Sequence, residues 1–242
     1  MMKIMNDDMQ FGEVNGFQFS GVRPDKLGST EYTLVSLVLD KTGSVSGFSS
    51  QLLDVKKSII QACRKSPRAN FLLFRNTEFN SSVDEVHGFL DLQKIDENQY
   101  QVPYCSGSTA LYDATFSAIA ASNLYAKDLT DKEFGVNAIV FVITDGDDNQ
   151  SIETINSVKN EIEKGVQNEW LESMQVILIG VNAAQYKSKL EQFTQQANLS
   201  QYVDIGDASS SKLAKLAQFV SRSISSQSQA LGTGGPSQLL TF

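Results

Sequence analysis

Side-chain oxygens are concentrated in two short loops of this sequence, each directly after a run of apolar residues. The first loop reads D-K-T-G-S over residues 40–44, and the second reads D-G-D-D-N over residues 145–149. Carboxylate and hydroxyl oxygens are the ligands that hard divalent cations such as Mg²⁺ prefer. The alternate positions Asp40, Thr42 and Ser44 can turn toward one point as the chain curls away from its apolar run. The two loops therefore predict a cation site.

A third segment, G-S-T-A-L-Y-D-A over residues 107–114, places small and hydroxyl-bearing residues just before a helical pattern. Taken alone, Thr109 in this segment would serve only to cap the helix. Taken with the other two loops, Thr109 becomes a third source of oxygen for the same ion. Asp147 and Asp148 could hold ion-bound waters, but a solvated acidic loop is the interpretation that we prefer for them.

The elements that must position these loops alternate between two patterns. Continuous apolar runs rich in β-branched residues predict buried strands at Tyr32–Asp40, Asn137–Thr144 and Met174–Gly180. Periodic patterns predict helices at Leu52–Arg64, Leu111–Lys127, Ile152–Gly165, Ala184–Ala197 and Ser210–Ser225. This alternation favours an α/β fold with a doubly wound, mostly parallel central sheet and helices on both faces. In such folds, ligands bind beyond the carboxyl ends of the strands.

Two further runs, 70–79 and 84–92, are separated by a turn too short for a helix, which predicts an antiparallel strand at one edge of the sheet. Residues 1–30 are interpreted as an N-terminal extension that packs on the body, and residues 31–226 as one domain. Residues 227–242 form an uncharged tail rich in Gly, Ser and Leu, which could be flexible or could dock through its apolar end.

The three loops together resemble the metal-ion-dependent adhesion site (MIDAS) of von Willebrand factor A domains. The resemblance covers about residues 32–226 and rests on D-x-S/T-x-S, a later threonine before a helix with D-A shortly after it, and T-D-G at a strand end. The chain looks most like the intracellular bacterial branch of that family, often found beside tellurium-resistance or kinase and phosphatase genes. The same strand, loop and helix order is what the fold of the family would require.

The resemblance implies a set of residues around the ion: Asp40, Thr42, Ser44, Thr109 and Asp145. The ion would be Mg²⁺ or Mn²⁺, with Ca²⁺ as an alternative, and a Glu or Asp of a protein partner would complete the coordination. Thr42 departs from the family, which usually has serine there. Threonine keeps the hydroxyl, so we expect binding to survive with an altered affinity.

The acidic composition of the chain limits the kinds of molecule that it can bind. The net charge of −8 and the pI near 4.7 argue against nucleic acid and anionic membranes. The first residues lack the apolar core of a secretory signal, and two cysteines, Cys63 and Cys105, fit a reducing compartment. We therefore expect a cytoplasmic protein. The lone histidine, His87, is interpreted as structural and not catalytic.

Two alternatives to a non-enzymatic binding module stay open. The segment D-K-T-G-S is similar to the phosphorylation loop of cation-pumping ATPases, so the chain could be a phosphoryl-transfer enzyme of the haloacid dehalogenase type with Asp40 as nucleophile. Against this, no nucleotide-binding insert separates the loops, and the segment around Thr109 would have no catalytic task. The other alternative is a structural subunit that keeps the loops but binds no metal.

Overall fold

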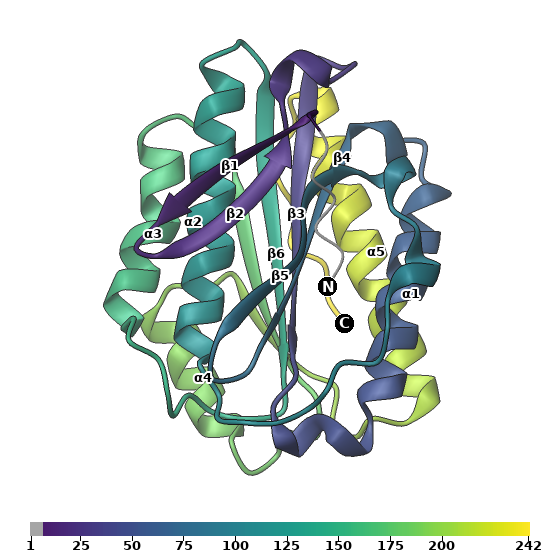
Figure 1. Cartoon of the computed structure of the whole chain (residues 1–242), viewed down its shortest axis with the longest axis vertical. Coiled ribbons are helices and arrows are strands. Elements are labelled where there is room, and N and C mark those ends of the chain that lie inside the picture. The colour runs from purple at the N-terminus through teal and green to yellow at the C-terminus, as the bar shows by residue number, and fades with distance from the viewer. Residues whose placement is uncertain (1–6) are drawn as a thin grey trace.

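The computed structural model describes residues 7–242 and contains an eight-stranded sheet (Figure 1). Along the sheet the strands are ordered β1-β2-β5-β4-β3-β6-β7-β8. Their bounds are β1 Met9–Val14, β2 Phe17–Val22, β3 Glu31–Asp40, β4 Leu72–Phe79, β5 Val83–Asp91, β6 Gly135–Thr144, β7 Met174–Gly180 and β8 Gln201–Asp204. Strands β4, β3, β6, β7 and β8 run parallel to one another, and β5 pairs antiparallel with β4. The predicted α/β fold class is confirmed.

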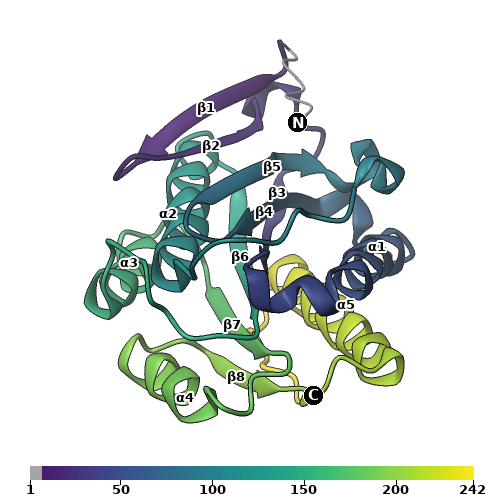
Figure 2. The ribbon, with the colours of Figure 1, turned by 60° about the horizontal axis from the view of Figure 1, so that its bottom comes forward.

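Helices cover both faces of the sheet, as Figures 1 and 2 show, with α1 and α5 on one face and α2, α3 and α4 on the other. Their bounds are α1 Ser49–Arg64, α2 Leu111–Thr130, α3 Ile155–Gln167, α4 Lys187–Gln196 and α5 Ser210–Thr233. Strands β3 and β6 are buried along almost their whole length because helices cover both of their faces. This explains why their sequences are continuous apolar runs and do not alternate.

The sheet continues beyond the predicted antiparallel strand. Strand β2 lies next to β5 and pairs with β1, so the N-terminal segment forms a hairpin on the sheet. The hairpin is held by Phe19, which is buried, and by the Tyr125 hydroxyl of α2, which donates to the carbonyl of Val22 over 2.6 Å. The approach is close: a Cβ atom on Gly88 of β5 would stand 2.0 Å from the Ser20 carbonyl oxygen, so only glycine fits there.

The last helix is longer than its sequence pattern predicts. Helix α5 continues past residue 225 to Thr233 because the buried side chains of Gln227, Ser228 and Leu231 extend its inner face. It ends at Gly234, whose left-handed backbone (φ 64°) stops the helix.

The tail after α5, residues 234–242, folds back onto the body. Its composition allowed either a flexible or a docked tail, and the structure has it docked. The ring of Phe242 meets Phe219 of α5 edge to face, with 5.7 Å between their centres. Nearer the helix, the carbonyl of Gln238 accepts a hydrogen bond of 3.2 Å from the side chain of Gln175 on β7. The apolar end of the tail thereby covers part of α5.

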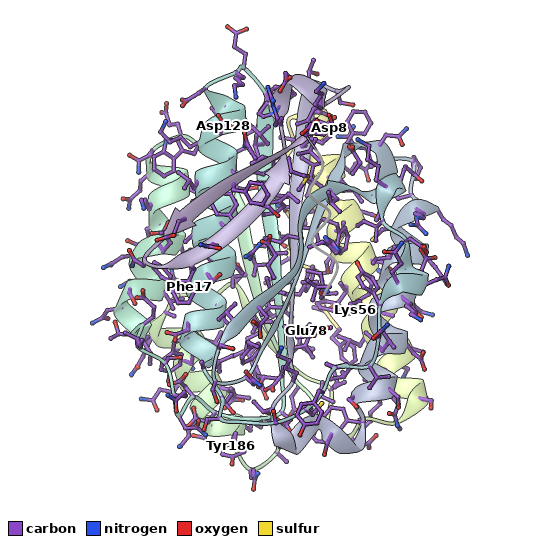
Figure 3. The ribbon with its side chains drawn as sticks, in the orientation of Figure 1. Asp8, Phe17, Lys56, Glu78, Asp128 and Tyr186 are labelled. Carbon is purple, nitrogen blue, oxygen red and sulfur yellow. The ribbon has the colours of Figure 1, made fainter. Side chains whose placement is uncertain are left out.

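Buried charges lie where α1 meets β4 and β5. The Lys56 ammonium and the Glu78 carboxylate are 2.9 Å apart, and Figure 3 labels the two residues close together. Nearby, His87 is hydrogen-bonded through one ring nitrogen to the Gly88 carbonyl and through the other to the Tyr100 hydroxyl. Burial lowers the pKa of His87 to about 4, so the ring is neutral at pH 7.

No helix within residues 7–242 combines the length and apolar character that crossing a bilayer requires. Both cysteines, Cys63 and Cys105, are free thiols in the structure.

The hairpin predicts a stability difference between two phenylalanines on its neighbouring strands, one register position apart. Replacing Phe19, which is 5% exposed, by Ala should lower the free energy of unfolding by about 3 kcal/mol, because a buried ring is lost and a cavity is left. The matched control is Phe11→Ala on β1, where the ring is 63% exposed and the change should stay within about 0.5 kcal/mol. Urea unfolding of both variants measures the difference, and equal losses would contradict the packing described here.

Candidate metal centre

The oxygen-bearing loops meet at the rim formed by the carboxyl ends of the parallel strands, which Figure 2 turns toward the viewer. Asp40 is the last residue of β3, and Asp145 follows the last residue of β6. These two strands are direct neighbours, with Leu39 paired to Ile143. The carboxylates of Asp40 and Asp145 are therefore brought to the same edge by strand pairing alone.

The Asp40 carboxylate is fixed by two hydrogen bonds and is only 1% exposed. One oxygen accepts from the backbone N–H of Thr42 over 2.7 Å, which bends the chain away from β3. The other accepts from the hydroxyl of Thr144 over 2.6 Å, across to the neighbouring strand. The side chain of Asp40 thus joins the ends of β3 and β6.

A continuous chain of polar contacts runs from the first loop to the second. A short 3-10 turn, Gly43–Gly47, follows Thr42 and turns Ser44 back toward the rim. The hydroxyl oxygens of Thr42 and Ser44 are 3.0 Å apart, and the Ser44 hydroxyl donates to Asp145 over 2.8 Å. Four of the five predicted residues are therefore connected side chain to side chain or through a backbone amide.

Thr109, the fifth predicted residue, lies against the second loop. Its hydroxyl oxygen is 3.8 Å from the point where a Cβ atom on Gly146 would stand. A reciprocal pair of hydrogen bonds holds it there: the Thr109 N–H donates to the Asn149 side chain over 2.8 Å, and the Asn149 N–H donates to the Thr109 carbonyl over 3.0 Å. The structure brings all five predicted residues to one rim.

The other two acidic residues of this loop, Asp147 and Asp148, contact α4 and α2. Asp147 forms an ion pair of 2.5 Å with Lys189 of α4. Asp148 accepts a hydrogen bond of 3.3 Å from the backbone N–H of Tyr112 in the first turn of α2. Neither carboxylate makes a hydrogen bond to the five predicted residues, in keeping with the weaker role that the sequence suggests for them.

Sequence reasoning missed two residues that organise the rim. Thr144 looked like the end of an apolar strand, and Asn149 like one more loop residue, yet they hold Asp40 and Thr109 respectively. A polar residue closing an apolar run is the signal that could have identified Thr144. Asn149 carries no comparable signal, because its partner is 40 residues away in the chain.

Electrostatics at the rim suit a bound cation. Burial, and to a smaller degree the neighbouring Asp145 charge, raise the pKa of Asp40 to about 6, against the lowering effect of its hydrogen bonds. Burial also raises the pKa of Asp145. A positive ion between the carboxylates would favour their ionised forms. Within residues 7–242, no three His, Cys, Asp or Glu side chains cluster as metal ligands, so an ion here needs the hydroxyls.

No protein-family profile matches this sequence, and no curated protein matches it. Several solved structures are similar to it in fold. The PilB minor pilin from Streptococcus sanguinis is 15% identical over 90% of this chain and 66% of the pilin, with a TM-score of 0.59. Proximal thread matrix protein 1 from the mussel byssus, with a zinc-occupied MIDAS motif, is 18% identical over 81% of this chain and 46% of its own, with a TM-score of 0.51.

The ArnB paralog VWA2 from Sulfolobus acidocaldarius is 11% identical, covers 81% of this chain and 46% of its own, and has a TM-score of 0.51. This chain thus spans two thirds or less of each of these proteins. At these identities the likeness concerns the fold. The chain has a von Willebrand factor A-like fold, as its loops and element order predicted.

The raised pKa of Asp40 predicts a pH-dependent stability of the metal-free protein. Because the folded-state pKa is about 6 and the ordinary value is 3.8, this group contributes stability below pH 4 that is lost as the pH rises through 6. Two pKa units set an upper limit of about 3 kcal/mol. In EDTA, the variant Asp40→Asn should therefore be about 1–3 kcal/mol more stable than the wild type at pH 7.5, and not at pH 4.

Urea unfolding at the two pH values measures this difference. Asp147→Asn is the control, because its carboxylate forms a surface ion pair with Lys189 and is not expected to share the pattern. A difference between wild type and Asp40→Asn that does not change with pH would show that Asp40 is not destabilised by its burial.

Proposed function

We propose that this protein is a divalent-metal-dependent interaction module, in which a bound Mg²⁺ or Mn²⁺ accepts a carboxylate from a protein partner. The observation that carries the proposal is the chain of polar contacts from Asp40 through Thr42 and Ser44 to Asp145. The elements that hold it are rigid: two buried parallel strands and a short turn.

The donor set accounts for why such an ion would seek a ligand from outside. Thr42, Ser44 and Thr109 offer neutral hydroxyls, and Asp40 already accepts two hydrogen bonds within the protein. An ion with few charged ligands of its own keeps a strong attraction for a carboxylate. Two acidic side chains and three hydroxyls are also a set of hard oxygen ligands, which favours Mg²⁺ or Mn²⁺ over softer metals.

The similar structures agree with binding as the activity. They are a minor pilin, a thread matrix protein with a zinc-occupied MIDAS motif, and an ArnB paralog. Those properties belong to those proteins. They support the proposal for this chain through the shared fold alone.

Phosphoryl transfer fits the geometry less well. A nucleophilic Asp40 would leave Thr109 without a catalytic task, although hydrogen bonds with Asn149 hold Thr109 at the same rim, whereas an ion site uses its hydroxyl. We therefore propose that the protein is not an enzyme. A cytoplasmic location and the tellurium-resistance-associated branch remain predictions from sequence alone.

Metal binding is tested by isothermal titration with Mg²⁺ and Mn²⁺. The wild type should show saturable heat, and Asp145→Ala should lose it, because the variant removes one of the two acidic groups and the acceptor of the Ser44 hydrogen bond. Asp147→Ala serves as the matched control and should bind as the wild type does. Absence of saturable heat in the wild type would leave the metal-free structural subunit as the better interpretation.

Partner binding is tested by affinity capture from the native cell extract with Mg²⁺, with EDTA, and with the Asp145→Ala protein. A partner should be retained only by the wild type with Mg²⁺. Equal capture in EDTA would rule out an ion as the bridge.

The enzymatic alternative has its own assay. Incubation with labelled ATP should leave no acid-stable, hydroxylamine-sensitive phosphate on the protein. A phosphoprotein of that kind, lost in Asp40→Asn, would establish phosphoryl transfer instead.

A further inference from the structure

A groove without acidic side chains lies between the end of α1 and the second half of α5. These two helices lie side by side in Figures 1 and 2. The groove has a volume of about 720 Å³, and a smaller hollow of about 240 Å³ adjoins it along α5. Arg222 and Leu240 line both spaces, so the two form one surface, the basic groove. No residue of the three rim loops lines it, which makes it separate from the candidate metal centre.

Three cations of the basic groove have no acidic partner. Within residues 7–242, every Lys and Arg side chain forms an ion pair except five: Lys57, Lys65, Lys159, Lys215 and Arg222. Lys65, Lys215 and Arg222 all line the basic groove, and all three are exposed. Their positive charges are therefore available to a ligand.

The sequence keeps acidic side chains away from this surface. No Asp or Glu follows Asp207, so the charged residues of α5 are all cations. Lys212, near the start of the helix, is paired with Asp207 over 2.8 Å. Arg68, which also lines the groove, is paired with Glu31. The unpaired cations thus give the basic groove a positive local potential, although the chain as a whole carries −8.

The walls between these cations offer hydrogen-bonding and apolar side chains. The hydroxyl oxygens of Ser66 and Ser225 are 3.3 Å apart and join the end of α1 to α5. Ser226 and Gln229 add further polar side chains along α5. Leu240 of the tail provides an apolar wall where the two spaces meet. A peptide suits this lining because one chain carries carboxylates, amide groups and apolar side chains together.

The unpaired cations are spread along the groove and do not surround one point. Lys215 and Arg222 are seven residues apart on α5, which places them on the same side of the helix and about 10 Å apart along its axis. Lys65 follows the last residue of α1, on the other wall. A single phosphate group would need donors within hydrogen-bonding distance of the same few oxygens. The spread favours a ligand with several separate carboxylates.

The net charge of the chain limits how large an anionic ligand can be. Nucleic acids and anionic membranes present negative charge over a broad area, which would meet the acidic remainder of the surface. A short segment can stay within the basic groove, where the lining contains no acidic side chain. Charge complementarity therefore selects a short acidic segment.

We propose that the basic groove binds a short acidic segment of a protein partner, with carboxylates beside Lys65, Lys215 and Arg222 and an apolar side chain against Leu240. This interaction requires no metal ion. It goes beyond the proposed function and does not depend on it, because the groove and the rim share no residue.

The test uses the full chain without divalent ions, so that no ion can hold a carboxylate at the rim. Three peptides with blocked ends are compared by chemical-shift titration at about 0.15 M salt, where charges more than about 8 Å apart are largely screened. They are Gly-Glu-Glu-Leu-Glu-Glu-Leu-Glu-Gly and the same sequence with every Glu replaced by Gln or by Lys. The Glu peptide should bind about tenfold or more tightly than the Gln peptide and shift amide signals of α5 and the end of α1. The Lys peptide should not bind measurably.

Two pairs of charge reversals separate the basic groove from the net charge. Lys215→Glu with Arg222→Glu should weaken binding of the Glu peptide about tenfold or more, because two cations of the groove become acidic. The matched control is Lys57→Glu with Lys159→Glu, which reverses two unpaired cations on α1 and α3. Both variants change the net charge by the same amount, so only the position of the charges differs. The control should bind the Glu peptide as the wild type does.

Three results would overturn the proposal. The Glu and Gln peptides binding equally well would show that carboxylates are not selected. Equal weakening in the two variants would show that the peptide responds only to net charge. Inorganic phosphate that displaces the Glu peptide when added at the same concentration would identify the groove as a phosphate site instead.

Discussion

Parallel pairing of β3 with β6 sets the geometry of the rim. It brings the ends of two strands, about a hundred residues apart in the chain, to one point of the rim. The Thr144 hydroxyl then reaches the Asp40 carboxylate across the gap between them. Parallel pairing of these strands requires the intervening chain to cross back over the sheet. That chain includes β4, β5 and α2, so the third loop of the rim, with Thr109, is carried to the same place.

The rim holds an electrostatically unfavourable carboxylate, that of Asp40, at the end of stably packed strands. Asp40 is buried almost completely, and its ionised form is disfavoured by that burial and by the neighbouring Asp145. Core side chains on both faces of β3 and β6 stabilise the strands well enough to hold the carboxylate in that position. The electrostatic cost of ionising Asp40 therefore falls at a position where a bound cation would offset it. This is the general expectation for a binding site built on a rigid scaffold.

Around this centre the fold is extended at both ends of the chain. The N-terminal hairpin lengthens the sheet beyond β5 and packs on α2 through Phe19 and Tyr125. The C-terminal tail lies over α5 and reaches β7. Neither extension contributes to the rim, whereas the loops that follow β5 and β6 carry both predicted site residues and exposed apolar side chains. The proposed metal site is therefore carried by loops, and the extensions complete the body that supports those loops.

Local patterns in the sequence predicted the fold class, the three long parallel strands and the five residues that meet at the rim, because long apolar runs and the oxygen-bearing loops at their ends can be recognised without tertiary contacts. It could not reveal that β2 pairs beside β5, that β8 is a strand of four residues, or that Asn149 holds Thr109. Each of these depends on contacts between residues distant in the chain, whose own sequences are short or ambiguous. Tertiary contacts were needed to show that Asp145 of the acidic loop faces the rim and Asp147 faces α4, because the direction of a loop side chain is set by its neighbours in space.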